Sequence, residues 1–352
     1  MQLTDSLPDQ LLDSLQDIAK IEIQSNFCIS HPDYEPLELP HEVVTRFQQL
    51  PGQFQRKYLS LQLRNFIYSI YFTGDAPAAN TNGTYQTDTA VITQSSDFYW
   101  QLHASNCGEG YFDSGWYILK QESDGSLAVQ KNGLTLHIQP QRHLQPEARL
   151  ASVGDTVAIR MPRNSVETKF YVAVGNTGLI NLHRDNRLET VYIYFNFIPE
   201  GAIALMRSLT QQLNSLKIAF TFKALFDPAN YNRNDSGVLY FERSNYNIIR
   251  QILQAVYAQN QSYFLSNVPL FTKLLAPGLG LAEKPESKET PGEFGLNRCQ
   301  IVADGLLDAW DNGDRTSNGR INAICKRFDS HFIDLQRPYL NALEDIYTPL
   351  CT

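Results

Sequence analysis

The sequence contains few cysteines and no long apolar run. Its five cysteines are scattered over 352 residues without a CxxC pair, which favours free thiols in a reducing compartment over a disulfide framework or a zinc site. No segment approaches the roughly 20 apolar residues that a membrane-spanning helix needs. Residues 1–20 carry acidic side chains where a signal peptide would have basic ones. We therefore expect a cytoplasmic protein that does not associate with a membrane.

Positive charge and common catalytic motifs are also scarce. There are 29 lysines and arginines against 37 aspartates and glutamates, a formal net charge of −8. Because no basic stripe with interleaved aromatic residues is present, nucleic-acid binding is not expected. The GxSxG, HExxH and kinase HRD motifs are absent, and no GK[ST] follows the glycines at 278 and 280. The seven histidines show no metal-ligand spacing.

The N-terminal part carries apolar residues at helical spacing. Residues 8–27 and 54–72 place leucine and isoleucine where they would share one helix face. Residues 74–90 are small and polar, as in a loop. The pattern predicts a helical region over residues 1–75, which we consider a possible docking region for a partner or a leader peptide.

From about residue 90 the pattern changes to strands, and then to alternating strands and helices. Residues 127–131 and 134–138 flank Asn132-Gly133, a strong hairpin signal, and 154–161 with 169–174 look like a second antiparallel pair. Further on, the apolar spacing predicts strands at 191–197, 218–225 and 237–241, and helices at 199–216 and 245–259.

These patterns together predict an α+β fold. We expect a helical N-terminal part, an antiparallel β-rich middle, and then β-α-β-β-α units packed with one or two helices in the last 40 residues. Residues 90–352 would form the second domain. Arg337-Pro338-Tyr339-Leu340 is the expected anchor of the C-terminal chain on the body.

Cationic side chains recur on the polar faces of the predicted strands. In the strand at 191–197 the apolar residues share one face, which leaves Tyr192, Tyr194 and Asn196 on the other. Strand-borne cations, with one more at a helix start, are Arg160, Lys169, Lys223, Lys273 and Arg298. If they converge, they form a positively charged cup suited to phosphate. The alternative is that they are ordinary solvated residues of a sheet.

Residues 271–310 combine several parts of an anion site. A short apolar segment with Lys273 leads into a glycine-rich turn, a polar loop follows at 283–293, and a helix opens near Asn297 and Arg298. Backbone N–H groups in the first turn of a helix bind anions, and the loop would be a lid over the site. A tight turn and a plain linker are the alternatives. His183, in a polar loop, is either a general acid or a surface histidine.

Five segments, in order along the chain, carry a resemblance to a known family. They are residues 110–116 (GYFDSGW), 194–202 (YFNFIPEGA), 222–228 (FKALFDP), 269–283 (PLFTKLLAPGLGLAE) and 294–299 (FGLNRC). They resemble the HopA-type type III effector family, which includes effectors of plant-pathogenic bacteria and the HopA-like lyases of class V lanthipeptide and thioamitide biosynthesis. The resemblance extends from about residue 100 to 340, and its last two segments are the most specific.

The resemblance implies a bacterial phosphoserine/phosphothreonine lyase. A separate Ser/Thr kinase would phosphorylate a precursor peptide, and the lyase would eliminate phosphate to give dehydroalanine or dehydrobutyrine, with no metal or organic cofactor. The reaction needs a base for the Cα proton and a cation or acid at the leaving phosphate. We expect Lys223 and Lys273 to be base and phosphate contact, in either order, with Asn196 orienting the substrate and His183 as acid. The expected phosphate ligands are Arg160, Lys169 and Arg298.

One position departs from the pattern of the family. Where the family often has histidine before the arginine of the 294–299 segment, this chain has Asn297. A proton donor at that position would have to be replaced by another group. The departure favours the alternative hypothesis, a non-catalytic phosphopeptide-binding or effector-like interaction protein.

Overall fold

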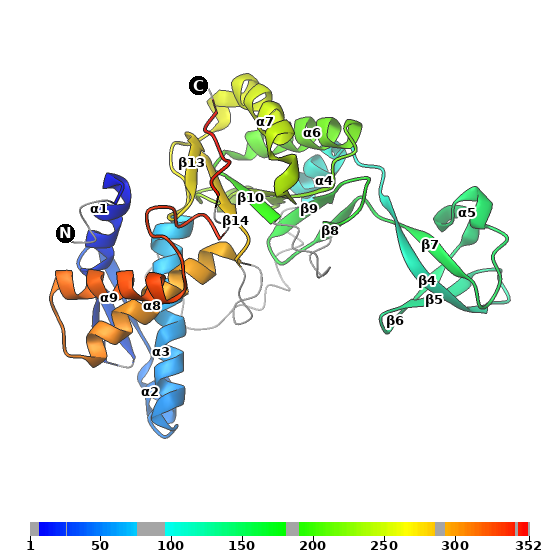
Figure 1. Ribbon diagram of the computed structural model, residues 1–352. Helices are drawn as coiled ribbons and strands as arrows, with labels where there is room; N and C mark the ends of the chain where they lie inside the picture. Colours follow the sequence, from blue (N-terminus) through cyan, green and yellow to red (C-terminus); the bar gives the residue numbers. More distant parts are fainter. Residues whose placement is uncertain are drawn as a thin grey trace.

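The computed structural model describes residues 7–25, 27–75, 96–180, 190–285, 293–341 and 344–350. It has three parts (Figure 1): a central sheet covered by helices, a layer built largely from the N-terminal chain, and a small sheet that projects to one side. His183, most of the loop at 74–90 and the middle of the 283–293 loop lie outside the described residues. No helix among those described is long and apolar enough to cross a membrane.

The central sheet has seven strands in the order β13-β14-β10-β12-β11-β9-β8, and all neighbours pair antiparallel. In chain order the strands are β8 (Asn164–Val166), β9 (Phe170–Val174), β10 (Thr190–Phe195), β11 (Phe220–Leu225), β12 (Gly237–Glu242), β13 (Lys273–Ala276) and β14 (Leu279–Glu283). The helices around it are α3 (Gly52–Ile67), its π-helical continuation η2 (Tyr68–Thr73), α4 (Ser96–Ser105), α6 (Pro199–Ser215), α7 (Tyr246–Asn260) and α8 (Phe294–Asp311). The chain order β10-α6-β11-β12-α7 confirms the predicted β-α-β-β-α unit and the α+β class.

Alternation along the strands gives the central sheet two different faces. Phe195 and Phe222 lie on the face that α6 and α7 cover. Tyr194 lies on the opposite face, where its ring contacts Phe72 of η2 and Phe294 of α8. Because neighbouring side chains of a strand point to opposite sides, this arrangement confirms the facing predicted for the strands at 191–197 and 218–225.

The N-terminal part contains a small sheet as well as helices. Three antiparallel strands follow α1 in the order β1-β2-β3, so the predicted helix over 8–27 is wrong beyond Ile18. Past that residue, buried Ile21 and Ile23 alternate with polar residues, and this period of two suits a strand. The elements are α1 (Asp9–Ile18), β1 (Glu22–Ser25), β2 (Cys28–His31), β3 (Tyr34–Glu38) and α2 (His41–Phe47). The helix predicted over 54–72 is confirmed by α3 and η2.

The projecting sheet has the order β6-β5-β4-β7 and its own apolar core around Trp116. Its elements are β4 (Tyr111–Gln121), β5 (Leu127–Lys131), β6 (Leu134–Ile138), α5 (Pro140–His143) and β7 (Thr156–Met161). Asn132 and Gly133 both have positive φ (51° and 81°), which confirms the predicted hairpin. The predicted pairing of 154–161 with 169–174 is wrong, because β7 pairs with β4 while β9 pairs with β8 and β11.

The last 40 residues contain one described helix, α9 (Ser317–Ser330), which packs on α8. After it, residues 334–341 and 344–350 run along the central sheet without helix, and the amide of Leu350 donates to the carbonyl of Leu275 at the edge strand β13. We call residues 334–350 the C-terminal strap. Tyr339 and Leu340 are buried, which confirms the predicted anchor at 337–340.

Candidate functional site

A cavity of about 50 Å³ lies between the tyrosine-bearing face of the central sheet and the helical segments η2 and α8. Since one water molecule needs roughly 15 Å³ measured in this way, the cavity holds a few waters or one small polar group. Its charged lining residues are Lys223, Arg233, Asp235 and Glu293, and its tyrosines are Tyr68, Tyr192, Tyr194 and Tyr240. We call this the tyrosine cavity.

Lys223 brings a cation into the wall of the tyrosine cavity. The residue is buried on β11, and its Nζ lies 4.9 Å from the ring centre of Phe170 and 5.1 Å from that of Tyr240. Its ion-pair contact among the described residues is Glu167, whose Oε2 is 3.4 Å away and whose side chain is largely exposed. Aromatic faces attract a desolvated ammonium group. The ammonium is therefore held by rings and by one loosely placed carboxylate.

Arg233 supplies a second cation, in a fixed orientation. Its Nε and Nη2 donate to the two carboxylate oxygens of Asp235, at 2.8 and 3.0 Å. The bond to Asp235 raises the pKa of Arg233, against the lowering effect of burial. A bidentate pair fixes the plane of the guanidinium. The Nη1 atom takes no part in this pair and donates no hydrogen bond to a described residue.

Four tyrosines surround these charges. Burial raises the pKa of Tyr68, Tyr192, Tyr194 and Tyr240 above the ordinary value of 10, so all four phenols are protonated at neutral pH. Within the part of the chain that the structure describes, no hydrogen bond occupies the hydroxyls of Tyr68, Tyr194 or Tyr240. Buried phenol groups normally find a partner. The cavity thus offers hydrogen-bond donors to a ligand.

The helix α8 begins at the wall of the same cavity. Glu293, its N-cap residue, lines the cavity and makes no side-chain cap bond, and Phe294 contacts the ring of Tyr194. The N-terminal end of a helix carries unpaired N–H groups and a partial positive charge that favour anions. The helix begins earlier than the predicted start near Asn297 and Arg298, and its N-terminal end is at the tyrosine cavity.

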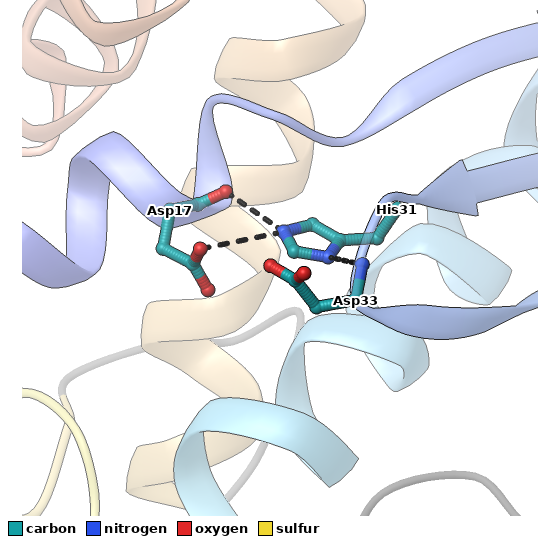
Figure 2. Close-up of side chains that lie close together, drawn as sticks. All are labelled: Asp17, His31 and Asp33. Carbon is teal, nitrogen blue, oxygen red and sulfur yellow. Dashed lines mark hydrogen bonds and ion pairs between the residues drawn. The ribbon is translucent and has the colours of Figure 1, made fainter.

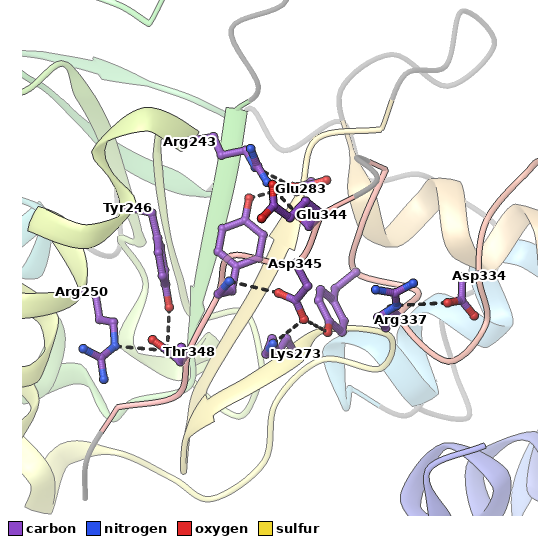
Figure 3. A network of polar contacts seen from close by, with 12 residues as sticks. Arg243, Tyr246, Arg250, Lys273, Glu283, Asp334, Arg337, Glu344, Asp345 and Thr348 are labelled. Carbon is purple, nitrogen blue, oxygen red and sulfur yellow. Dashed lines mark hydrogen bonds and ion pairs between the residues drawn. The ribbon is translucent and has the colours of Figure 1, made fainter. Parts of the chain in front are cut away.

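Lys273 occupies a different place, on the strap side of the sheet. Its Nζ lies 2.6 Å from Oδ2 of Asp345, which also accepts a hydrogen bond of 2.6 Å from the hydroxyl of Tyr339. Figure 3 shows Lys273 and Asp345 pointing toward one another. Burial alone would raise the pKa of Asp345, but the bonds from Lys273 and Tyr339 hold it below its usual value. The chain itself therefore satisfies this cation with a carboxylate.

The sheet register separates Lys273 from Lys223. Lys273 pairs with Leu281, and this row continues through Ile193 and Leu239 to Phe222. Directly paired residues share a face and neighbours along a strand do not, so Lys223 and Lys273 point to opposite faces. They are also four strand spacings apart, about 19 Å. The expectation that both lysines face one phosphate is wrong.

Arg298 and Arg160 also lie away from Lys223. Arg298 is buried, and its three guanidinium nitrogens donate to groups of the chain, among them the carbonyls of Pro338 and Leu340. Burial lowers its pKa to about 10, so it remains charged at neutral pH. Arg160 is on the projecting sheet and donates to the carbonyl of Glu109. The predicted single cup of five cations is not formed.

Two further predicted residues lie near the tyrosine cavity. Lys169 is exposed on the turn that carries Glu167, and its carbonyl accepts a bond from the amide of Phe226, just after β11. Asn196 is buried, and its Nδ2 donates to Asn267 and Asn234. Asn196 therefore holds together the loop that carries Arg233 and the segment before β13. Its role toward a substrate stays a prediction.

The other half of the site, formed by Tyr68 and the 231–235 loop, has only a weak signal in the sequence. The loop at 231–235 is polar and follows the strand of Lys223, so it was as compatible with lining a groove as with a plain connection. Tyr68 lies in a region that reads only as an amphipathic helix. Helices containing a π-helical turn are often found at functional sites, but that turn is not visible in the sequence. Contact between η2, the 231–235 loop and α8 depends on tertiary packing.

Asp17, His31 and Asp33 form a second cluster with metal-ligand residue types (Figure 2). Nδ1 of His31 accepts a hydrogen bond from the amide of Asp33, so Nε2 carries the proton and donates to the carbonyl of Asp17, 3.1 Å away. Lys20 neutralises Asp17 at 2.7 Å. A metal would need a free nitrogen lone pair, and both nitrogens of His31 are occupied. The cluster fastens α1 to the β2–β3 hairpin.

Comparison with known proteins identifies the family of this chain. A model of the HopA1 effector protein family matches residues 161–340, slightly more than half of the chain. The protein therefore belongs to the HopA1 effector protein family. The matched residues include Lys223, Arg233 and Asp235 of the tyrosine cavity.

Two solved structures of Pseudomonas syringae effector proteins are similar to this chain. One is from pathovar tomato strain DC3000, with 15% identity and a TM-score of 0.46, covering 97% of this chain and 99% of the other. The second is from pathovar syringae strain 61, with 15% identity and a TM-score of 0.46, covering 96% and 99%. No curated protein sequence matches the chain.

Proposed function

We propose that the protein is a phosphoserine/phosphothreonine lyase that acts on a phosphorylated precursor peptide at the tyrosine cavity. The observation that supports this proposal is the cavity itself. Lys223 and Arg233 surround a space of about 50 Å³ together with the carboxylates of Asp235 and Glu293 and three phenol hydroxyls that form no hydrogen bond with a described residue. Arginine and lysine are the side chains that recognise phosphate. A bacterial cytoplasm, a separate Ser/Thr kinase and a peptide natural-product pathway are parts of the same proposal.

The reaction assigns one task to each group of the cavity. The amine of Lys223, once its ammonium form has released a proton, takes the proton from Cα of the phosphorylated residue. The electron pair of that C–H bond forms the Cα–Cβ double bond while the Cβ–O bond breaks, and phosphate leaves with the bonding electrons. Arg233 holds the departing phosphate, and the tyrosine hydroxyls donate hydrogen bonds to the negative charge that develops. Metal ions and organic cofactors have no part in this scheme.

The test is the conversion of a phosphopeptide by the purified full-length chain. Mass spectrometry should show the loss of phosphoric acid and a product that adds a thiol, as a dehydroamino acid does. The variant Arg233→Gln should raise KM about tenfold or more, because a charged hydrogen bond to the phosphate is lost. Arg207→Gln, on α6 at the other face of the sheet, is the matched control. Unchanged phosphopeptides, tested in several sequences with either phosphorylated residue, would contradict the proposal.

A non-catalytic phosphopeptide-binding protein is the second candidate. Asn297 favours it, since an amide neither donates nor accepts a proton at neutral pH, and its Oδ1 is engaged by Nη1 of Arg298 at 2.6 Å. This candidate predicts phosphopeptide binding that depends on Lys223 and Arg233, with no loss of phosphate over long incubation.

A further inference from the structure

A second, larger hollow lies in the N-terminal part of the molecule. It has a volume of about 640 Å³ and is bounded by the β1–β2 hairpin, the end of β3, α2 and the start of α3. Pockets that hold drug-sized ligands or short peptide segments have volumes of this order, about 300–1,000 Å³. We call it the N-terminal groove.

The N-terminal groove has apolar walls and a polar rim. Phe27, Leu39 and Val44 line it with half-buried apolar side chains. The ring of Phe27 packs against Phe47, at 6.5 Å between ring centres, so this wall is fixed by packing. Exposed polar side chains of the rim include Glu38 and Gln48. An occupant therefore needs an apolar side chain next to a polar or charged one.

The charge around the groove indicates which charge the occupant should carry beside its apolar side chain. Residues 7–58, which include all walls of the groove, contain eight acidic and four basic side chains. Two of the basic ones are bound to carboxylates, Lys20 to Asp17 and Arg56 to Asp311. Glu22, Glu35, Glu38 and Glu42 form no ion pair with any residue that the structure describes. Complementary charge steers association and selects partners. The groove thus favours a partner that carries lysine or arginine.

The groove is connected to the tyrosine cavity by one helix. Gln55 lines the groove and Tyr68 lines the cavity, and both belong to the continuous segment of α3 and η2. At about 1.5 Å per residue the two sites are separated by about 20 Å along this segment. An extended chain covers that distance with about six residues. The length of the helix between the two sites is thus within the reach of a short peptide.

We propose that the N-terminal groove binds an extended peptide segment in which a basic residue adjoins an apolar one. The apolar side chain packs on Phe27, Leu39 and Val44, and the basic side chain reaches Glu38. Resting on the proposed function, this segment belongs to the substrate peptide and lies at least about six residues from the phosphorylated residue. The groove then selects the peptide, while the cavity acts on the phosphate.

The experiment is a selection from a library of short random peptides on the immobilised full-length protein, followed by fluorescence anisotropy with the enriched peptides. Enriched peptides should carry lysine or arginine beside an apolar residue. Glu38→Gln should weaken their binding up to about fivefold, as expected for an exposed ion pair. Val44→Gln should weaken binding more strongly, because it places an amide in the apolar wall. Glu35→Gln, also on β3 but outside the groove lining, is the matched control.

Failure of this inference can be told apart from failure of the proposed function. Enrichment of peptides without a basic residue, or equal binding to Glu38→Gln and Glu35→Gln, would overturn the groove assignment even if phosphopeptides are converted. If basic peptides bind through Glu38 while no phosphopeptide is converted, only the lyase proposal fails. Lys223→Met should leave binding of the selected peptides unchanged, since they carry no phosphate.

Discussion

Lys223 and Lys273 look alike in the sequence, but they are placed in different environments by the fold. Both are strand residues followed directly by an apolar residue, and both side chains are mostly buried. Lys223 faces a cavity, with a largely exposed carboxylate 3.4 Å away, whereas Lys273 is bound at 2.6 Å by Asp345 of the C-terminal strap. A lysine that the chain pairs tightly with a carboxylate has a structural role, whereas a lysine with only a loosely placed partner is available to a ligand.

The largest expected effect is on turnover by Lys223 variants. Lys223→Met removes the proposed base and should lower kcat/KM for phosphopeptide elimination by about 10²–10⁴-fold, the range of general acid–base catalysis. Lys273→Met should stay within a few-fold of wild type at a temperature where both variants remain folded. Comparable losses in the two variants, measured by phosphate release, would remove the distinction between the two lysines.

For the stability of the fold, the site of Lys273 should matter more than that of Lys223. Asp345→Asn weakens charged hydrogen bonds from Lys273 and Tyr339 and should lower the free energy of unfolding at pH 7 by about 1.5–3 kcal/mol. Because the pKa of Asp345 is held below its usual 3.8, its contribution is present above that pH and is lost as the pH falls through the lowered value. Urea unfolding of wild type and variant should therefore converge in strong acid.

The part of this difference that depends on neighbours within one strand could be predicted from the sequence, and the part that depends on residues far apart in the chain could not. The alternation in β10 and β11 correctly placed Tyr192, Tyr194 and Lys223 on one face, since facing within a strand is local. The face of Lys273 depends on the register of β13 against β14, across a turn at Gly278. A Cβ atom at position 278 would clash with the carbonyl oxygen of Leu265. No local sequence pattern indicates that register, and none indicates that Asp345, 72 residues further along the chain, contacts Lys273.

The prediction of a helix beyond Ile18 is wrong for a similar reason. Leu11, Leu15 and Ile18 have helical spacing and form the buried side of α1. The continuation through Ile21 fits a helix equally well, but Ile21 and Ile23 also fit a strand, and pairing between β1 and β2 selects the strand. The hairpin at Asn132-Gly133 was predictable because both of its residues must adopt positive φ, which is a local requirement.

A smaller effect on phosphopeptide turnover is expected from Asp235, the partner of Arg233. Asp235→Asn keeps the shape of the carboxylate but removes its charge, so the guanidinium of Arg233 loses its bidentate partner. We expect KM for the phosphopeptide to rise by about three- to tenfold, with kcat changed less, because the phosphate contact becomes less ordered. Glu242→Gln, at the far end of β12, serves as the control. A fall in kcat alone would assign Asp235 to the chemical step instead.

The smallest effect on turnover is expected in the projecting sheet. Asn132→Ala places alanine at a φ of 51°, which should cost about 1 kcal/mol of stability, whereas Thr135→Ala leaves the turn intact. Thermal unfolding should report this difference, and elimination should be unchanged in both variants. Lower activity of either folded variant would mean that this sheet takes part in the site.

The most direct test of the central claim is a crystal structure of the Lys223→Met variant with a phosphoserine peptide. The account predicts the phosphate in the tyrosine cavity, within hydrogen-bond distance of Nη1 of Arg233, with the Lys273–Asp345 pair intact. A phosphate bound to Lys273 in place of Asp345, with the tyrosine cavity empty, would contradict it.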